Sequence, residues 1–196
     1  MACCGGKKTK NDHFSTFSDA AYNGNIDKMR ECLKKEAKSK KNKMEDVINE
    51  KHGDFNMTAL HFAVQKKGNI EAVKFLIQNQ ANVKAQTKNG ETPLHIACYH
   101  RNEEAVKELL TTEARQDVNT AEKLSGMTPL HIAVCKGSPG VIDLLLQNGA
   151  DPKIKDKNGH DCFDSADFWA NQDTVAASPN ANHSQAYDVL KNAMRA

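Results

Sequence analysis

One short phrase recurs along this chain and limits what the chain can fold into. It reads TALHFA from Thr58, TPLHIA from Thr92 and TPLHIA again from Thr128, so the copies start 34 and 36 residues apart. Each copy can begin a helix, because Thr is a good N-cap. In the second and third copies Pro follows, which fits the first helical position because its missing N–H would have no partner there. Recurrence at a period of roughly 20–50 residues is typical of a repeat array. We therefore expect a stack of similar units.

A second apolar segment follows each phrase at a nearly fixed distance. A Val or Ile lies 14 or 15 residues after the Thr, and two large aliphatic residues follow three and four residues later. A turn-rich stretch, such as KNGET at 88–92, then leads to the next phrase. One helix pair with a single apolar face cannot bury that face alone, but stacked pairs bury it as one continuous core. These second segments are 70–83, 103–118 and 139–152.

A T-P-L-H-x-A motif repeated at this spacing resembles the signature of the ankyrin repeat family. The resemblance extends over nearly the whole chain, with three copies in register. It implies an all-α ankyrin repeat solenoid of about five helix-turn-helix units joined by β-turn fingers. It also implies structural roles for the Thr and the His of each phrase, with the His joining hydrogen bonds that tie a finger to its helix. These residues are Thr58, His61, Thr92, His95, Thr128 and His131.

One incomplete unit lies at each end of the array, in the same register as the complete repeats. Ser15 takes the Thr position of the first unit, but Ser18 replaces its His. Asp161 takes the Thr position of the last unit, and an insertion rich in turn formers, 171–183, then separates its two helices. Terminal units of a solenoid are atypical because one of their faces meets water. The predicted segments are a flexible tail (1–13), an N-terminal capping repeat with a basic insertion (14–57), three repeats (58–91, 92–127 and 128–160) and a degenerate C-terminal capping repeat that ends in a capping helix (161–196).

The basic insertion in the first unit is KKEAKSKKNK (34–43), which carries six lysines. The part KSKKNK could act as a nuclear import signal. We favour a solvated loop between repeats, because runs of charge usually remain hydrated.

The composition argues against several classes of protein. A net charge of +2 argues against a nucleic-acid-binding protein, whose domain usually has a dominant basic face. No apolar run is long enough for a membrane helix, and no signal peptide is recognisable. The six cysteines lack the spacing of a disulfide scaffold, so reduced thiols fit best. We expect a cytoplasmic monomer that binds no nucleic acid.

The segment MACCGGKKTK at the N-terminus has a separate interpretation. Cys3 and Cys4 beside several lysines could be S-acylated, which would give the chain a membrane contact through its tail. N-myristoylation is excluded because Ala2 stands where that modification requires glycine. The favoured alternative is a tail that carries no lipid.

Neither catalysis nor a cofactor is predicted. The spacing His95-x-x-Cys98 resembles half of a zinc site, but the recurring histidines belong to separate repeats and a zinc site needs four convergent ligands. No cysteine has a neighbourhood that would activate it as a nucleophile. The segment CCGGKK lacks the strand and helix context of a phosphate-binding loop. We expect a chain that is not an enzyme, with no metal and no cofactor.

Function is therefore expected in a binding surface. The resemblance implies that a protein partner binds to the finger tips and to the concave surface of the first helices, which is an analogy at the level of the fold. The seventh residue after each Thr position should face that surface, and three of five are aromatic although aromatics are only 6% of the chain. Exposed Tyr and Trp beside cations are typical of binding hot spots. The alternative for Phe168 and Trp169 is that the insertion at 171–183 covers them.

The predicted role is that of an adaptor, scaffold or inhibitor. The alternatives are a membrane-tethered adaptor and a secreted bacterial effector that mimics or blocks a host protein. The predicted partner-binding residues are Tyr22, Lys66, Tyr99, His100, Arg101, Lys136, Phe168 and Trp169 on the first helices, and Lys88, Asn89, Leu124 and Met127 on the fingers.

Overall fold

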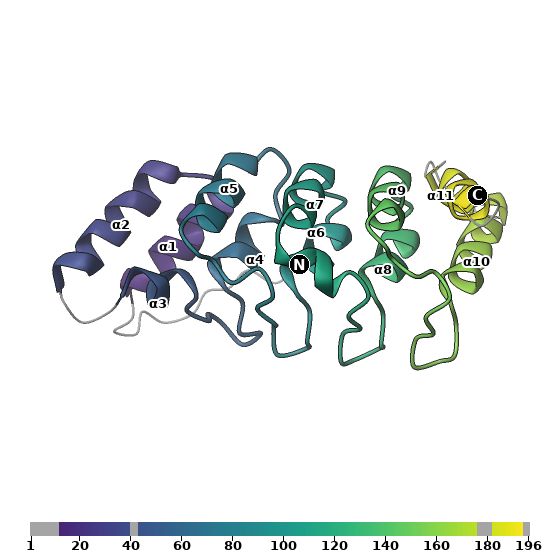
Figure 1. Cartoon of the computed structure of the whole chain (residues 1–196), viewed down its shortest axis with the longest axis horizontal. Coiled ribbons are helices and arrows are strands. Elements are labelled where there is room, and N and C mark those ends of the chain that lie inside the picture. The colour runs from purple at the N-terminus through teal and green to yellow at the C-terminus, as the bar shows by residue number, and fades with distance from the viewer. Residues whose placement is uncertain (1–11, 40–42, 176–181, 194–196) are drawn as a thin grey trace.

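The computed structural model describes residues 12–39, 43–175 and 182–193. In this part of the chain, helix pairs stack side by side into an elongated slab (Figure 1). The first helices of the pairs form one row, the second helices form another, and the fingers project along the edge next to the first row. The described residues contain no β-strand, and the only sheet-like pairing among them is an isolated bridge between His52 and Met57. The all-α solenoid predicted from the sequence is confirmed.

The described chain contains five helix pairs and two short elements between them. The first helices are α1 (Asp12–Asn23), α4 (Ala59–Ala63), α6 (Pro93–Tyr99), α8 (Pro129–Cys135) and α10 (Cys162–Val175). The second helices are α2 (Ile26–Ser39), α5 (Ile70–Gln78), α7 (Glu103–Leu110), α9 (Pro139–Gln147) and α11 (Asn182–Ala193). The short elements are α3 (Met44–Ile48) and the 3₁₀ helix η1 (Glu113–Asp117).

The aliphatic residues of the second segments form the core between the two rows. Val73, Val106 and Ile142 are fully buried, as is the first member of each aliphatic pair. Burying one such side chain stabilises the fold by about 1.5–3 kcal/mol. Because each repeat contributes the same positions, the core runs without a break from α1 to α11.

The Thr and His of each phrase form the same helix cap. The backbone N–H of Thr58 donates to His61 Nδ1 at 3.1 Å, and Thr92 and Thr128 repeat this bond at 3.2 Å with their own histidines. The proton of the neutral ring is therefore on Nε2. In His61 this Nε2 donates to the Glu91 carbonyl at 3.2 Å, which ties the cap to the next finger. His131 makes the same bond at 3.3 Å to the carbonyl of His160.

His95 differs from its two equivalents. Its Nε2 is buried and has no hydrogen-bond partner in the described part of the chain. The next finger is closed by Glu122 and Met127, which makes it one residue longer than the finger closed by Thr87 and Glu91. We attribute the missing bond to this extra residue, because it shifts the carbonyl that would accept.

Polar side chains join successive repeats at a second place. Asn69, just before α5, donates to the carbonyls of Ala21 and Tyr22 at 3.1 and 2.7 Å. Asn102, just before α7, donates to the carbonyls of Val64 and Lys66 at 2.9 and 3.2 Å. Both side chains satisfy carbonyls at the end of the preceding first helix, which have no partner within that helix.

The ends of the array differ from the expectation in three places. The basic insertion (34–43) is helical at its start, because α2 continues to Ser39 through good helix formers, with Lys35 paired to Glu31 at 2.7 Å. The inserted loop (171–183) is also helical at its start, because α10 continues to Val175 and no Pro or Gly interrupts it. Helix α1 begins at Asp12, inside the segment expected to be a tail.

Candidate protein-binding surface

Exposed aromatic side chains recur along the first helices, near the C-terminal ends of α1 and α6 and in the middle of the longer α10. We give the name first-helix face to the surface that consists of the seventh, eighth and ninth residues after each Thr position. Tyr22, Tyr99 and Phe168 are 43, 53 and 56% exposed on it, in the first, third and fifth repeats. The equivalent Gln65 and Cys135 are half-buried. The aromatic side chains therefore alternate with smaller or polar ones along this face.

Tyr99 is held in place from two sides. Lys136, from the next repeat, places its Nζ 3.7 Å from the centre of the Tyr99 ring. The His100 ring meets Tyr99 edge-on, with the ring centres 5.3 Å apart. Burial lowers the pKa of His100, and the nearby Lys136 cation lowers it further. His100 is therefore neutral at pH 7, and the charge beside Tyr99 comes from Lys136.

Trp169 and Phe168 have different surroundings. The Trp169 ring stacks on His183 at 5.6 Å and an interplanar angle of 18°, and Trp169 is 36% exposed. Phe168 meets Trp169 edge-on at 5.3 Å but remains more exposed. His183 belongs to α11 and also donates to the Cys135 carbonyl at 3.1 Å. The end of the predicted insertion therefore covers one face of Trp169, and Phe168 stays accessible.

Cations accompany the aromatic residues on the first-helix face. Lys66 and Lys67 are exposed just after the first helix of the second repeat, and Arg101 is half-buried just after the first helix of the third. Lys67 and Arg101 line one pocket of about 260 Å³ together with Gly68, Asn102, Glu103 and Glu104. Lys66 and Arg101 were predicted from the sequence to bind a partner, and Lys67 was not.

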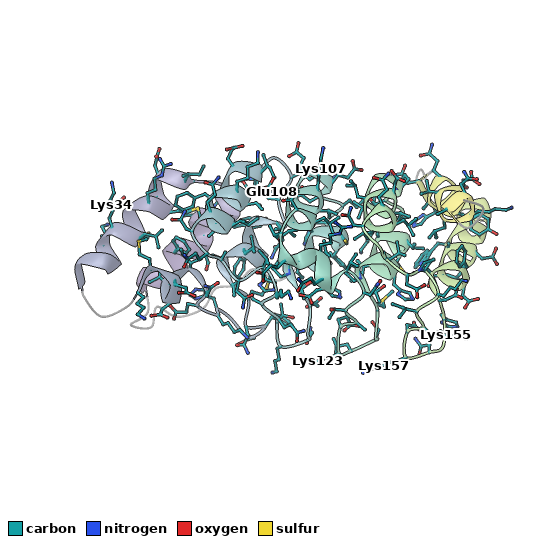
Figure 2. The ribbon with its side chains drawn as sticks, in the orientation of Figure 1. Lys34, Lys107, Glu108, Lys123, Lys155 and Lys157 are labelled. Carbon is teal, nitrogen blue, oxygen red and sulfur yellow. The ribbon has the colours of Figure 1, made fainter. Side chains whose placement is uncertain are left out.

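The fingers are joined tip to tip by backbone hydrogen bonds. The N–H groups of Lys88, Lys123 and Lys157 each donate to a carbonyl of the preceding finger at 2.7–2.8 Å. Figure 2 shows Lys123, Lys155 and Lys157 on this finger edge, and Lys107 and Glu108 on the opposite edge with the second helices. The bonds make the edge a connected strip.

Acidic side chains of the fingers are used inside the fingers themselves. Glu122 accepts from the N–H groups of Leu124 and Ser125 at 2.6 and 2.7 Å. Burial of Glu122 would raise its pKa, but the hydrogen bonds from Ser125, Leu124 and Met127 outweigh that effect and lower it. Asp156 accepts in the same way from residues of its own finger. The lysines are exposed, so the edge presents mainly positive charge.

Two exposed apolar side chains lie on the same edge. Leu124 is 68% exposed, Met127 and Asn89 are half-buried, and Phe55 is 57% exposed. Phe55 was missed in the sequence analysis, which considered only the fingers after the first clear phrase. The register of the His52–Met57 finger would have placed it at a tip.

Neither a metal-binding cluster nor a reactive thiol at Cys98 is present among the described residues. No group of three or more His, Cys, Asp or Glu side chains among them could hold a metal ion. Cys98 is fully buried, and burial raises the pKa of its thiol far above the ordinary range, so it is neutral and inert. Within the described ranges, no helix is long and apolar enough to cross a membrane. Cys3 and Cys4 lie outside the described residues.

Comparisons with known proteins agree with the stacked-repeat architecture. The family model for ankyrin repeats in three copies matches residues 4–87 and 60–156. The chain is 36% identical over 118 residues to mouse ankyrin repeat and SOCS box protein 16, a match that covers 56% of this chain and 25% of that protein. It is 38% identical over 101 residues to the probable 26S proteasome regulatory subunit p28 of Saccharomyces cerevisiae, which covers 50% of this chain and 43% of that protein.

A third relative is the human transient receptor potential cation channel subfamily A member 1, which is 39% identical over 110 residues. That match covers 56% of this chain and 9% of the channel. The matches thus span less than half the length of each of these three relatives. Ankyrin repeats are generally non-catalytic modules for protein–protein interaction. The family model covers most of the chain, and the chain therefore belongs to the ankyrin repeat family.

Proposed function

We propose that this chain binds a protein partner on the first-helix face, with the finger edge as a secondary contact, and acts in the cytoplasm as an adaptor, scaffold or inhibitor without chemistry of its own. The observation that carries the proposal is Tyr99, a large aromatic side chain that is 53% exposed in the middle repeat. Tyr is among the residues most enriched in binding hot spots, which lie near the centre of an interface.

The surroundings of Tyr99 support this role. Lys136 and His100 fix the ring before any partner arrives. A side chain that is already ordered loses less conformational entropy on binding, so more of the contact energy contributes to affinity. The backbone beneath Tyr99 is rigid as well, since α6 is capped by His95 and packs against α7 and α8.

The test compares two exposed aromatic residues of similar size. Wild type, Tyr99→Ala and Phe55→Ala are immobilised, proteins are captured from a lysate and identified by mass spectrometry, and affinities are then measured with the purified partner. Tyr99→Ala should weaken binding by roughly 2 kcal/mol or more, with an unchanged melting temperature because Tyr99 lies outside the core.

Phe55→Ala is the comparison variant, since Phe55 is similarly exposed but lies on the finger edge, where we expect a smaller loss of binding because that edge is the secondary contact. If only Phe55→Ala loses the partner, the finger edge is the main surface and the proposal for the first-helix face is wrong. If Tyr99→Ala unfolds the chain, Tyr99 is structural and the proposal also fails.

A further inference from the structure

Arg101 lies in the turn between the two helices of its repeat. Three other repeats have glycine at the equivalent place in this turn. The φ of Arg101 is +53°, in the left-handed region. The equivalent residues, each just before the Asn or Ser that precedes the second helix, are Gly24 at +70°, Gly68 at +81° and Gly137 at +58°. A residue with a Cβ is strained in this conformation, whereas glycine is not. The fold therefore gives no reason for an arginine here.

The guanidinium of Arg101 is not used inside the protein. No hydrogen bond or ion pair joins it to any described residue, although Glu103 and Glu104 line the same pocket. The Glu103 carboxylate lies against Gly140 of the next repeat instead. A strained residue whose side chain has no internal partner suggests a functional constraint.

Other cations lie on the same face as Arg101. Lys67 lines the same pocket, and its neighbour Lys66 is exposed. Lys136 reaches in from the following repeat and lies over Tyr99. The chain as a whole has a net charge of only +2, so the positive charge of these side chains is a local feature of this face. Lys67, Arg101 and Lys136 thus bring positive charge from three successive repeats to the first-helix face, and Lys136 lies over the Tyr99 ring.

We propose that Arg101 binds a carboxylate of an acidic segment in the protein partner, with Lys67 and Lys136 as further cations and Tyr99 as the apolar anchor. The inference rests on the proposed function and specifies the chemistry of the partner. The planar guanidinium pairs with a carboxylate through two parallel hydrogen bonds, which lysine cannot do. The pocket holds Lys67 and Arg101 against Glu103 and Glu104, so its net charge is about zero and it would attract a polyanion such as DNA or an anionic membrane only weakly. A single carboxylate can still pair with Arg101, because a bidentate pair depends on the geometry of the guanidinium and not only on net charge.

The experiment selects a ligand without presupposing its charge. A random-peptide phage library is selected on the full chain, and the peptides obtained are synthesised for affinity measurements. We expect peptides enriched in Asp or Glu beside an apolar residue. Arg101→Gly should weaken their binding roughly tenfold, and replacing the peptide carboxylate with its amide should weaken binding to wild type but hardly further to Arg101→Gly.

The same substitution should not destabilise the fold, because it installs the glycine that this turn favours. The matched control is Gln80→Gly, which relieves a left-handed residue with φ +67° just after the second helix α5, outside the first-helix face. We expect both variants to keep or raise the melting temperature, and only Arg101→Gly to lose peptide affinity. A marked fall in the melting temperature of Arg101→Gly would overturn the argument from strain.

The failures of the two proposals are distinguishable. Peptides that need Tyr99 but are not acidic, or that bind Arg101→Gly as well as wild type, refute the carboxylate site and leave the proposed function standing. Peptides unaffected by Tyr99→Ala, or an unsuccessful selection, count against binding on the first-helix face itself. Phosphatidylserine vesicles or single-stranded DNA that bind more tightly than the peptides, through Arg101, would overturn the choice of an acidic peptide.

Discussion

Lys136 Nζ lies 3.7 Å from the centre of the Tyr99 ring, so a cation of the fourth repeat covers the aromatic side chain of the third. Such a pair is worth about 0.5–1 kcal/mol when it is exposed. The contact crosses the boundary between repeats and ties the candidate hot spot to its neighbour. A partner that covers Tyr99 must therefore also contact Lys136.

Replacing Lys136 with Met keeps the length of the side chain but removes its charge. We expect the association rate with the captured partner, and the salt dependence of that rate, to fall, while dissociation changes less, because charges at the rim of an interface mainly steer the encounter. Stopped-flow association at several salt concentrations measures this. Lys157→Met, on the finger edge, is the control, and an equal effect of both variants would show that only overall charge matters.

The repeated histidines offer an internal comparison of hydrogen bonds. His61 and His95 cap equivalent helices, but only His61 has a partner for its Nε2. We expect His61→Ala to lower the free energy of unfolding by about 1–3 kcal/mol, and His95→Ala to lower it by about 1 kcal/mol less. Urea denaturation of both variants measures the difference in the free energy of unfolding. Taking this difference cancels the cost of the cavity that both substitutions leave. Equal losses would contradict the assignment, and a shift of the melting temperature with EDTA would point to a metal that this assignment does not include.

Buried histidines should also make stability depend on pH. Burial lowers the pKa of His61 and of His95 to about 4, and it lowers the pKa of His131 as well. Between about pH 4 and 6.5 the unfolded chain binds more protons than the folded chain, so the free energy of unfolding rises with pH. The stability that depends on the buried histidines being neutral should be fully present above about pH 6.5, and it should be lost as the pH falls toward 4. Glu122 and Asp156, whose pKa values are lowered, contribute to the loss only at lower pH.

The measurement is urea denaturation at several pH values in that window. His61→Asn should reduce the slope of unfolding free energy against pH by about one proton, since one buried imidazole is removed. His160→Asn is the control, because His160 is exposed. A slope that is the same in His61→Asn and wild type would show that His61 is not buried as described.

The sequence predicted the repeated parts of this fold well and the irregular parts poorly. The recurring Thr-Pro pairs place the starts of α6 and α8 at Pro93 and Pro129, because local capping chemistry determines where a helix begins. The continuation of α2 through the lysine-rich segment was missed, because a charge run was interpreted as a loop although Lys, Glu and Ala favour helix. The strain at Arg101 could have been predicted from the register, because the equivalent positions of other repeats hold Gly24, Gly68 and Gly137, and a recurring glycine indicates a left-handed turn.

The role of His183 could have been found in the sequence. It lies seven residues before the buried Leu190, as Asn69 and Asn102 lie seven residues before Leu76 and Leu109. All three side chains bond to carbonyls of the preceding repeat. The insertion in the fifth repeat obscured this register, since it separates the two helices by more residues than in the other units.

The last prediction concerns how α11 is held on the array. The His183 ring lies directly over Gly137, where a Cβ would approach its Cδ2 to 2.9 Å. Gly137→Ala should therefore displace His183 and loosen α11, in addition to the strain of an alanine at φ +58°. Gly68→Ala is the matched control, because φ there is +81° but no atom lies within 4 Å of the added Cβ. Trp169, the only Trp in the chain, stacks on His183 and reports the contact by its fluorescence. We expect Gly137→Ala to change the native Trp169 spectrum and to lower the melting temperature more than Gly68→Ala does. Equal melting temperatures with an unchanged Trp169 spectrum would show that α11 is held by its apolar contacts with α9 and α10 alone.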